Sequence, residues 1–145
     1  KKVSRVLMCS GKVYYLLRAA RIEQKRDDIA IVRIEQLYPF PLHATRAIMA
    51  TYPNMKSLSW VQEEPRNMGA WRHLRHRFNH CAPDGLTVDS IGRDSRAVPA
   101  TGVPAVHKRE EDELVKGAMA SNPEDYVVRR IERKRKNGVV HSKAE

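Results

Sequence analysis

Ser10-Gly11-Lys12 is the first place in this sequence where residue types and spacing could do chemistry. The three residues lie between an apolar run, Val6 to Cys9, and a helical pattern that begins at Val13. Such a turn between a strand and a helix often binds phosphate on the free amides of the helix. The glycine spacing matches neither the dinucleotide fingerprint nor the P-loop. We therefore predict a structural turn, with an anion site as the alternative.

Two adjacent carboxylates end a later apolar run, in Gln62-Glu63-Glu64-Pro65. Parallel sheets place ligands at the ends of their strands, so this position could carry chemistry. General acid–base pairs usually converge from different elements, however, and one glutamate could simply favour the N-terminus of the next helix. We predict a structural role for this stretch.

Three histidines, His73, His76 and His80, share one face of a predicted helix at spacings of three and four residues. That spacing could hold zinc. Arginines lie between them and would repel a cation, and no second group of ligands is evident. The pattern favours a solvated basic face.

The two cysteines, Cys9 and Cys81, form neither a metal-ligand pair nor a disulfide framework. Cys9 ends an apolar run and is expected to be a small buried residue. A reducing compartment fits this usage.

Positive charge is the most unusual bulk property, with a net charge of +10 over 145 residues. Residues 1–60 hold 11 Lys and Arg against 4 acidic residues, residues 61–120 hold 9 against 9, and residues 121–145 hold 7 against 4. Such an excess suits nucleic acid, anionic lipid or an acidic protein surface, and charge alone does not choose among them.

The tail carries a dense basic block that could contact a phosphate backbone. Few aromatic residues accompany it for base stacking, so we predict a protein-docking helix, with a solvated tail as the alternative and RNA possible but not favoured. The basic residues of this block are Arg129, Arg130, Arg133, Lys134, Arg135 and Lys136.

The elements that must position these residues alternate along the chain. Strand patterns cover residues 6–9, 29–34, 58–62 and 86–91. Two helical patterns begin after residues 12 and 41, and two more cover residues 67–80 and 105–120. The alternation predicts an α/β domain with a doubly wound, mostly parallel sheet. The length suits one such domain, and no apolar stretch is long enough for a membrane helix.

Local features refine these elements. Ser10 is expected to cap the first helix, and Pro39 and Pro41 to end the second strand. The apolar face of the second helix is predicted to hold Leu42, Ala47, Ile48 and Met49, and Glu63-Glu64-Pro65 to end the third strand.

Four separated blocks of the sequence resemble one family in the correct order. They are VLMCSGKVYY, IAIVRIEQLYPFP, WVQEEPRNMGAW, and GRDSRAVPATG followed by VHKREEDELV. From about Val3 to Ala120 the chain resembles the C-terminal domain of the thiamine diphosphate-dependent, decarboxylating component of 2-oxoglutarate dehydrogenase. The resemblance implies a transketolase C-terminal-like domain at 1–120, to which 121–145 add a basic helix and tail.

The resemblance also implies where the chemistry lies. In that family thiamine diphosphate, its magnesium and the catalytic histidines belong to two preceding domains, so no catalytic, cofactor-binding or metal-binding residue is expected in this chain. The terminal domain supports the dimer and packs against the cofactor-carrying domains, and it belongs to an enzyme only within a longer chain. Interface or anion contacts are expected for the matching residues Ser10, Lys12, Gln62, Glu63, Glu64, Arg93 and Arg96.

An alternative follows from departures from the family pattern. The basic extension and the histidine- and arginine-rich stretch HLRHRFNHC suggest a reused, non-catalytic accessory subunit of a large mitochondrial assembly, such as a respiratory complex or ribosome. Protein subunits are the expected partners in both cases. The expected location is the mitochondrial matrix or the matrix face of a mitochondrial complex, or the cytoplasm if the source is bacterial.

Overall fold

The computed structural model describes residues 2–83 and 86–121, in which strands and helices alternate throughout. The alternation confirms the predicted α/β class. The elements are β1 (Arg5–Cys9), α1 (Val13–Glu23), β2 (Ile29–Arg33), α2 (Leu42–Ala50), β3 (Ser57–Pro65), α3 (Trp71–Cys81), β4 (Thr87–Arg93) and α4 (Pro104–Met119).

The four strands form one parallel sheet in the order β2-β1-β3-β4. Arg5 of β1 pairs with Ile29 on one side and Ser57 on the other, so β1 lies inside the sheet. All five residues of β1 are buried. A parallel strand covered on both faces must be apolar on both, which explains the continuous run Val6 to Cys9.

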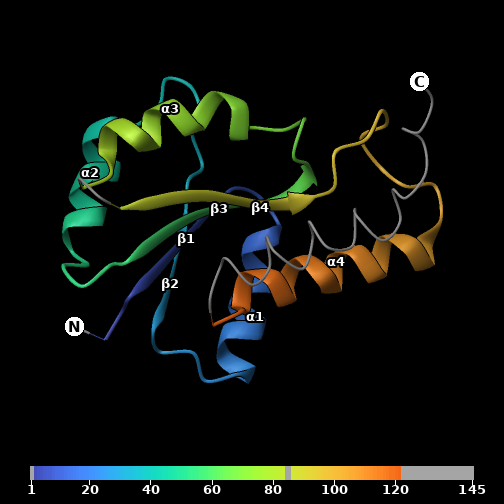
Figure 1. The fold of residues 1–145 in the computed structure, drawn as a ribbon, viewed down its shortest axis with the longest axis horizontal. Coiled ribbons are helices and arrows are strands. Elements are labelled where there is room, and N and C mark those ends of the chain that lie inside the picture. The colour runs from blue at the N-terminus through green and yellow to red at the C-terminus, as the bar shows by residue number, and fades with distance from the viewer. Residues whose placement is uncertain (1, 84–85, 122–145) are drawn as a thin grey trace, which may run out of the picture.

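Helices cover both faces of the sheet, as a doubly wound fold requires. Figure 1 shows α2 and α3 on one face and α1 and α4 on the other. Trp60 and Phe78 centre the core under α2 and α3, whereas Leu7, Leu17 and Leu114 fill the core under α1 and α4. Burying each such leucine contributes about 1.5–3 kcal/mol.

The segment between β2 and α2 differs from the prediction. β2 ends at Arg33, well before Pro39, so the prolines do not end the strand. The buried ring of Phe40 anchors the segment instead, packing edge-on against Phe78 with 5.7 Å between ring centroids. Pro41 then occupies the N-cap position of α2, which places the two prolines at the entry to the helix.

β3 runs three residues further than predicted, because Pro65 still pairs with Arg93 after an irregularity in the register. A proline tolerates this last position because it offers no ladder donor. β4 likewise extends to Arg93, beyond the predicted end at Ile91. The extension matters because it carries both strand ends to the same edge.

Two helices also differ from their predictions. The helix expected from Asn67 begins at Trp71, and a turn precedes it. In α2 the buried residues are Thr45 and Met49, whereas Ala47 and Ile48 are exposed. Thr45 is accommodated because its hydroxyl donates a 2.8 Å hydrogen bond to the carbonyl oxygen of Pro41. Within residues 2–83 and 86–121, no helix is long and apolar enough to cross a membrane.

Candidate functional site

The carboxyl ends of the parallel strands gather the predicted site residues at one edge of the sheet, which we call the carboxyl edge. β1 leads into Ser10 and Lys12, β3 ends with 62–65, and β4 ends with Arg93, followed by Arg96. Open α/β sheets bind ligands at this edge, so its geometry decides what the chain can do.

The turn after β1 is tied to the end of β3. Lys12 Nζ lies 3.1 Å from Glu63 Oε1, with the lysine side chain 67% exposed and the glutamate 23% exposed. Such an exposed pair contributes less than about 1 kcal/mol. Gly11 has φ of +71°, a conformation that a glycine adopts without strain. The predicted Ser10 cap is wrong, because Lys12 occupies the N-cap position of α1 and no side chain caps it.

Gln62 is the best-connected side chain of the carboxyl edge, and it is buried. Its Oε1 accepts hydrogen bonds from Trp60 Nε1 at 2.9 Å and from the backbone amide of Trp71 at 3.1 Å. Its Nε2 donates to the carbonyl oxygens of Pro65 at 3.0 Å and Met68 at 2.8 Å. One amide group therefore fixes the end of β3, the turn and the start of α3.

Two glycines make room for the Gln62 side chain. A Cβ on Gly69, whose φ is +70°, would lie 2.9 Å from Gln62 Nε2. A Cβ on Gly92 would lie 3.2 Å from Gln62 Cγ and 3.1 Å from the carbonyl oxygen of Glu64. The close approach of backbone to side chain therefore depends on glycine at both positions.

Arg93 and Arg96 share one carboxylate, Glu110 of α4. The side chain of Arg93 is 5% exposed and that of Glu110 11%, with Arg93 Nη1 3.8 Å from Glu110 Oε2. Arg96 binds both oxygens of Glu110. Arg93 Nη2 also lies 3.0 Å from His107 Nδ1, and because a guanidinium only donates, Nδ1 must accept.

This cluster of Arg93, Arg96, Glu110 and His107 contains two guanidinium groups and one carboxylate, which leaves an excess of positive charge. Within the described residues, Nε of Arg93 is buried without a hydrogen-bond partner. Sequence analysis predicted the two arginines but missed His107 and Glu110. The signal was present, because the two residues are three apart at the start of a helix and so share a face.

The loops after β3 and β4 are joined by an amide pair. Asn67 Nδ2 donates to the carbonyl oxygen of Arg96 at 2.9 Å, and its Oδ1 accepts from the Arg96 amide at 3.1 Å. The Arg66 amide donates to the carbonyl oxygen of Arg93 at 2.9 Å. These bonds hold Arg96 in place for its contact with Glu110.

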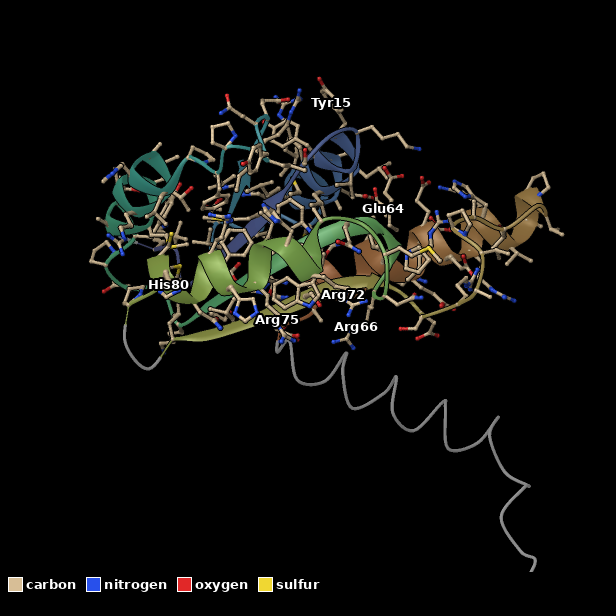
Figure 2. All side chains as sticks on the ribbon, turned by 90° about the horizontal axis from the view of Figure 1, so that it is seen from above. Tyr15, Glu64, Arg66, Arg72, Arg75 and His80 are labelled. Carbon is tan, nitrogen blue, oxygen red and sulfur yellow. The ribbon has the colours of Figure 1, made fainter. Side chains whose placement is uncertain are left out.

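A further arginine, Arg33 at the end of β2, lies against two tyrosine rings of α1. Its guanidinium carbon is 5.4 Å from the ring centroids of both Tyr14 and Tyr15, and its Nη1 donates to the Tyr15 hydroxyl at 3.1 Å. Glu35 pairs with the same arginine. Figure 2 shows Tyr15 pointing away from the body of the domain.

Cys9, the register partner of Arg33 in the sheet, is fully buried, as predicted. Burial raises the pKa of its thiol to about 12. The thiol is therefore protonated near neutral pH, and a buried protonated thiol is a poor nucleophile.

The described glutamates of the carboxyl edge are either ion-paired or exposed to solvent. Glu63 is paired with Lys12, and Glu64 is exposed at the end of β3 (Figure 2). Among the described residues, no three or more His, Cys, Asp or Glu side chains are placed to hold a metal ion. His73, His76 and His80 are all exposed on α3, as a solvated basic face predicts.

The tail prediction, Arg129 to Lys136, lies outside the described residues. Of the seven predicted contact residues, Gln62 and Arg93 direct their side chains into this chain. Lys12 and Glu64 are exposed at the carboxyl edge.

Comparison with known proteins fits this architecture. The family model described as 2-oxoglutarate dehydrogenase C-terminal matches residues 1–119. This chain belongs to the 2-oxoglutarate dehydrogenase C-terminal family. The resemblance read from the four sequence blocks is thereby confirmed.

Curated relatives of this C-terminal family member are 2-oxoglutarate dehydrogenase E1 components. That of Coxiella burnetii is 47% identical over 121 residues, covering 82% of this chain and 13% of the relative. That of Geobacillus kaustophilus is 44% identical over 122 residues, with 83% and 13% covered, and that of Azotobacter vinelandii is 45% identical over 121 residues, with 81% and 13% covered. The chain thus spans a small part of the length of these relatives.

Proposed function

We propose that this chain is a terminal supporting region of a 2-oxoglutarate dehydrogenase E1-type protein and does not decarboxylate 2-oxoglutarate by itself. The match of residues 1–119 to the C-terminal family carries the proposal. The span of 13% of the Coxiella burnetii relative supports it, because most of that enzyme's length has no counterpart here.

The architecture of the carboxyl edge supports a role in scaffolding. Gln62, Asn67 and Glu110 each join two or more segments of the chain. Such cross-links hold a surface in one shape, which is what a domain that packs against neighbouring domains requires.

Contacts to neighbouring domains or anions are part of the same proposal. Lys12 and Glu64 are exposed, and Arg96 is half-buried, so these side chains could bind groups outside this chain. The positive excess around Arg93 and Arg96 suits a carboxylate or phosphate of such a partner.

Thiamine diphosphate and magnesium are proposed to bind to other parts of a longer protein. The carboxyl edge does not fit a magnesium–diphosphate group, because its half-buried carboxylates are already paired. Glu63 is held by Lys12, and Glu110 by Arg93 and Arg96.

A chimaera tests this proposal. Residues 1–119 replace the corresponding C-terminal region of the Coxiella burnetii E1 component, and 2-oxoglutarate decarboxylation and native mass are compared with the parent and with a deletion of that region. We expect the chimaera to keep the assembly and most of the activity, and the deletion to lose both. This chain alone, supplied with thiamine diphosphate and magnesium, should release no carbon dioxide from 2-oxoglutarate. Decarboxylation by the isolated chain, or a folded but inactive chimaera, would contradict the proposal.

The alternative of an accessory subunit of a mitochondrial assembly stays a prediction. The relatives described above are bacterial E1 components and do not favour it. Copurification of the endogenous protein with respiratory or ribosomal subunits, at the mass of this chain alone, would support it.

A further inference from the structure

The outward side of α3 is a basic surface. Residues 66–80 contain four arginines, three histidines and no Asp or Glu. α3 buries Leu74, Phe78 and Cys81 against the sheet, which leaves its basic side chains on the opposite side. We call the exposed residues Arg72, His73, Arg75, His76 and His80 the α3 basic face.

The two arginines of the α3 basic face are not engaged within the described chain. Neither the Arg72 nor the Arg75 side chain forms a hydrogen bond or ion pair with a described residue. Figure 2 shows Arg72, Arg75 and His80 at successive points along α3, with Arg66 beside Arg72. These arginines can therefore bind a partner without first breaking a contact with a described residue.

An exposed aromatic residue borders this face. Tyr38 is 79% exposed, and its ring centroid lies 6.4 Å from that of His73. Tyrosine and arginine are the residue types enriched in protein–protein interfaces, where they supply much of the binding energy. Tyr38 belongs to the segment between β2 and α2, and its ring lies beside His73 of the helix that carries the two arginines. An aromatic residue next to exposed arginines favours a macromolecular partner over a small anion.

We propose that the α3 basic face, with Tyr38 at its border, docks a carboxylate-rich surface of a protein. Charge complementarity carries the proposal, since arginine forks bind carboxylates through paired hydrogen bonds. Only the two arginines carry charge that does not depend on pH. A protein that binds a nucleic-acid backbone at physiological salt uses more permanently charged contacts than two, because salt weakens each of them. The α3 basic face therefore favours a protein partner over nucleic acid.

This surface is distinct from the carboxyl edge and does not depend on the function proposed above. Arg72 and Arg75 belong to the layer formed by α2 and α3, whereas Arg93 and Arg96 contact α4 on the other face of the sheet (Figure 1). A negative result for the α3 basic face therefore does not contradict the function proposed for the carboxyl edge, and the reverse also holds.

The test measures binding of two labelled probes to the 145-residue chain by fluorescence anisotropy. One probe is a glutamate-rich helical peptide, and the other is an oligouridine of the same net charge. The Arg72→Gln/Arg75→Gln variant removes the proposed contacts. Its matched control is Arg18→Gln/Arg109→Gln, which removes equal charge from exposed positions of α1 and α4.

We expect the peptide to bind more tightly than oligouridine at physiological salt. The α3 variant should weaken peptide binding by about tenfold, as the loss of two charge-assisted contacts predicts, and the control by much less. Tyr38→Ser should weaken it further. If both double variants lose peptide affinity equally, binding depends only on net charge, and the proposal is overturned. Absence of peptide binding would also overturn it, and preferential oligouridine binding that depends on Arg72 and Arg75 would replace it with a nucleic-acid surface.

Discussion

Arginines at the carboxyl edge and on α3 have opposite environments in the same small domain. Arg93 is buried against Glu110 and His107, and Arg96 binds the same glutamate. Arg72 and Arg75 are exposed and have no partner among the described residues. The comparison teaches that the number of basic residues says little about function, because one pair stabilises the fold and the other is available to a partner.

The buried and exposed arginines differ in their contribution to stability because they differ in hydration. A buried charge loses its hydration and depends on the groups around it, whereas an exposed charge keeps its water and contributes little to stability. The predictions below therefore concern the free energy of unfolding, with four variants taken from the largest expected loss to the smallest.

Glu110→Gln should cause the largest loss, about 3–5 kcal/mol in the free energy of unfolding, because it leaves the buried guanidinium of Arg93 without a counter-charge. Urea denaturation measures it. The matched control is Lys108→Gln, which removes pairs with Glu111 and Asp112 made by a lysine side chain that is 66% exposed. The control should cost much less, because an exposed ion pair contributes little to stability. Equal losses in the two variants would remove the distinction between the buried and exposed pairs.

Gln62→Leu should cost about 2–4 kcal/mol, because it leaves Trp60 Nε1 and the Trp71 amide without an acceptor in a buried site. The change should also alter tryptophan fluorescence, since tryptophan residues donate both hydrogen bonds. Gln36→Leu is the control, because the Gln36 amide makes an exposed hydrogen bond to the carbonyl oxygen of Pro39. If unfolding of Gln62→Leu matches that of the control, the role assigned to Gln62 is wrong.

Arg5→Met tests a second buried arginine. Unlike Arg93, Arg5 has no carboxylate within ion-pair distance among the described residues. Its Nη1 donates to the carbonyl oxygen of Ala120, while Nε and Nη2 have no partner among the described residues. Burial, and then the charge of Arg26, lower its pKa to about 10. Replacing such a charge with an apolar side chain of similar size should cost less than about 1 kcal/mol at neutral pH.

The pH dependence of the Arg5 variant has a definite sign. A pKa that is lower in the folded state means that the unfolded state binds the proton more tightly, so wild type gains stability relative to Arg5→Met as pH rises past about 10. Urea denaturation of both proteins at pH 7 and at about 10.5 measures the difference. If Arg5→Met instead gains stability relative to wild type at high pH, the lowered pKa of Arg5 is contradicted.

Arg72→Gln/Arg75→Gln should have the smallest effect on stability, within about 0.5 kcal/mol, because exposed side chains without partners contribute little. Thermal and urea unfolding check it on the same samples that are used for binding. A large loss of stability would mean that these arginines support the fold, and the contrast with Arg93 would disappear.

Sequence patterns predicted the fold well and its connections less well. Short apolar runs located all four strands, because covered parallel strands must be apolar on both faces. The end of β3 was misplaced because its pairing to Arg93 depends on a neighbouring strand. Ala47 and Ile48 were assigned to the core because their spacing cannot show that Thr45 satisfies its hydroxyl on the backbone.

The amino-acid sequence by itself determined the α/β alternation, the parallel sheet and membership of the 2-oxoglutarate dehydrogenase C-terminal family. Periodicity and the order of short blocks are local properties, and they can be read along the chain. Only the tertiary structure decided which charges are used internally. Arg96 meets Glu110 across 14 residues and Arg5 meets Ala120 across 115, and such contacts depend on how the layers pack. Arg72 and Arg75 stay exposed for the same reason, because α3 turns Leu74 and Phe78 toward the sheet.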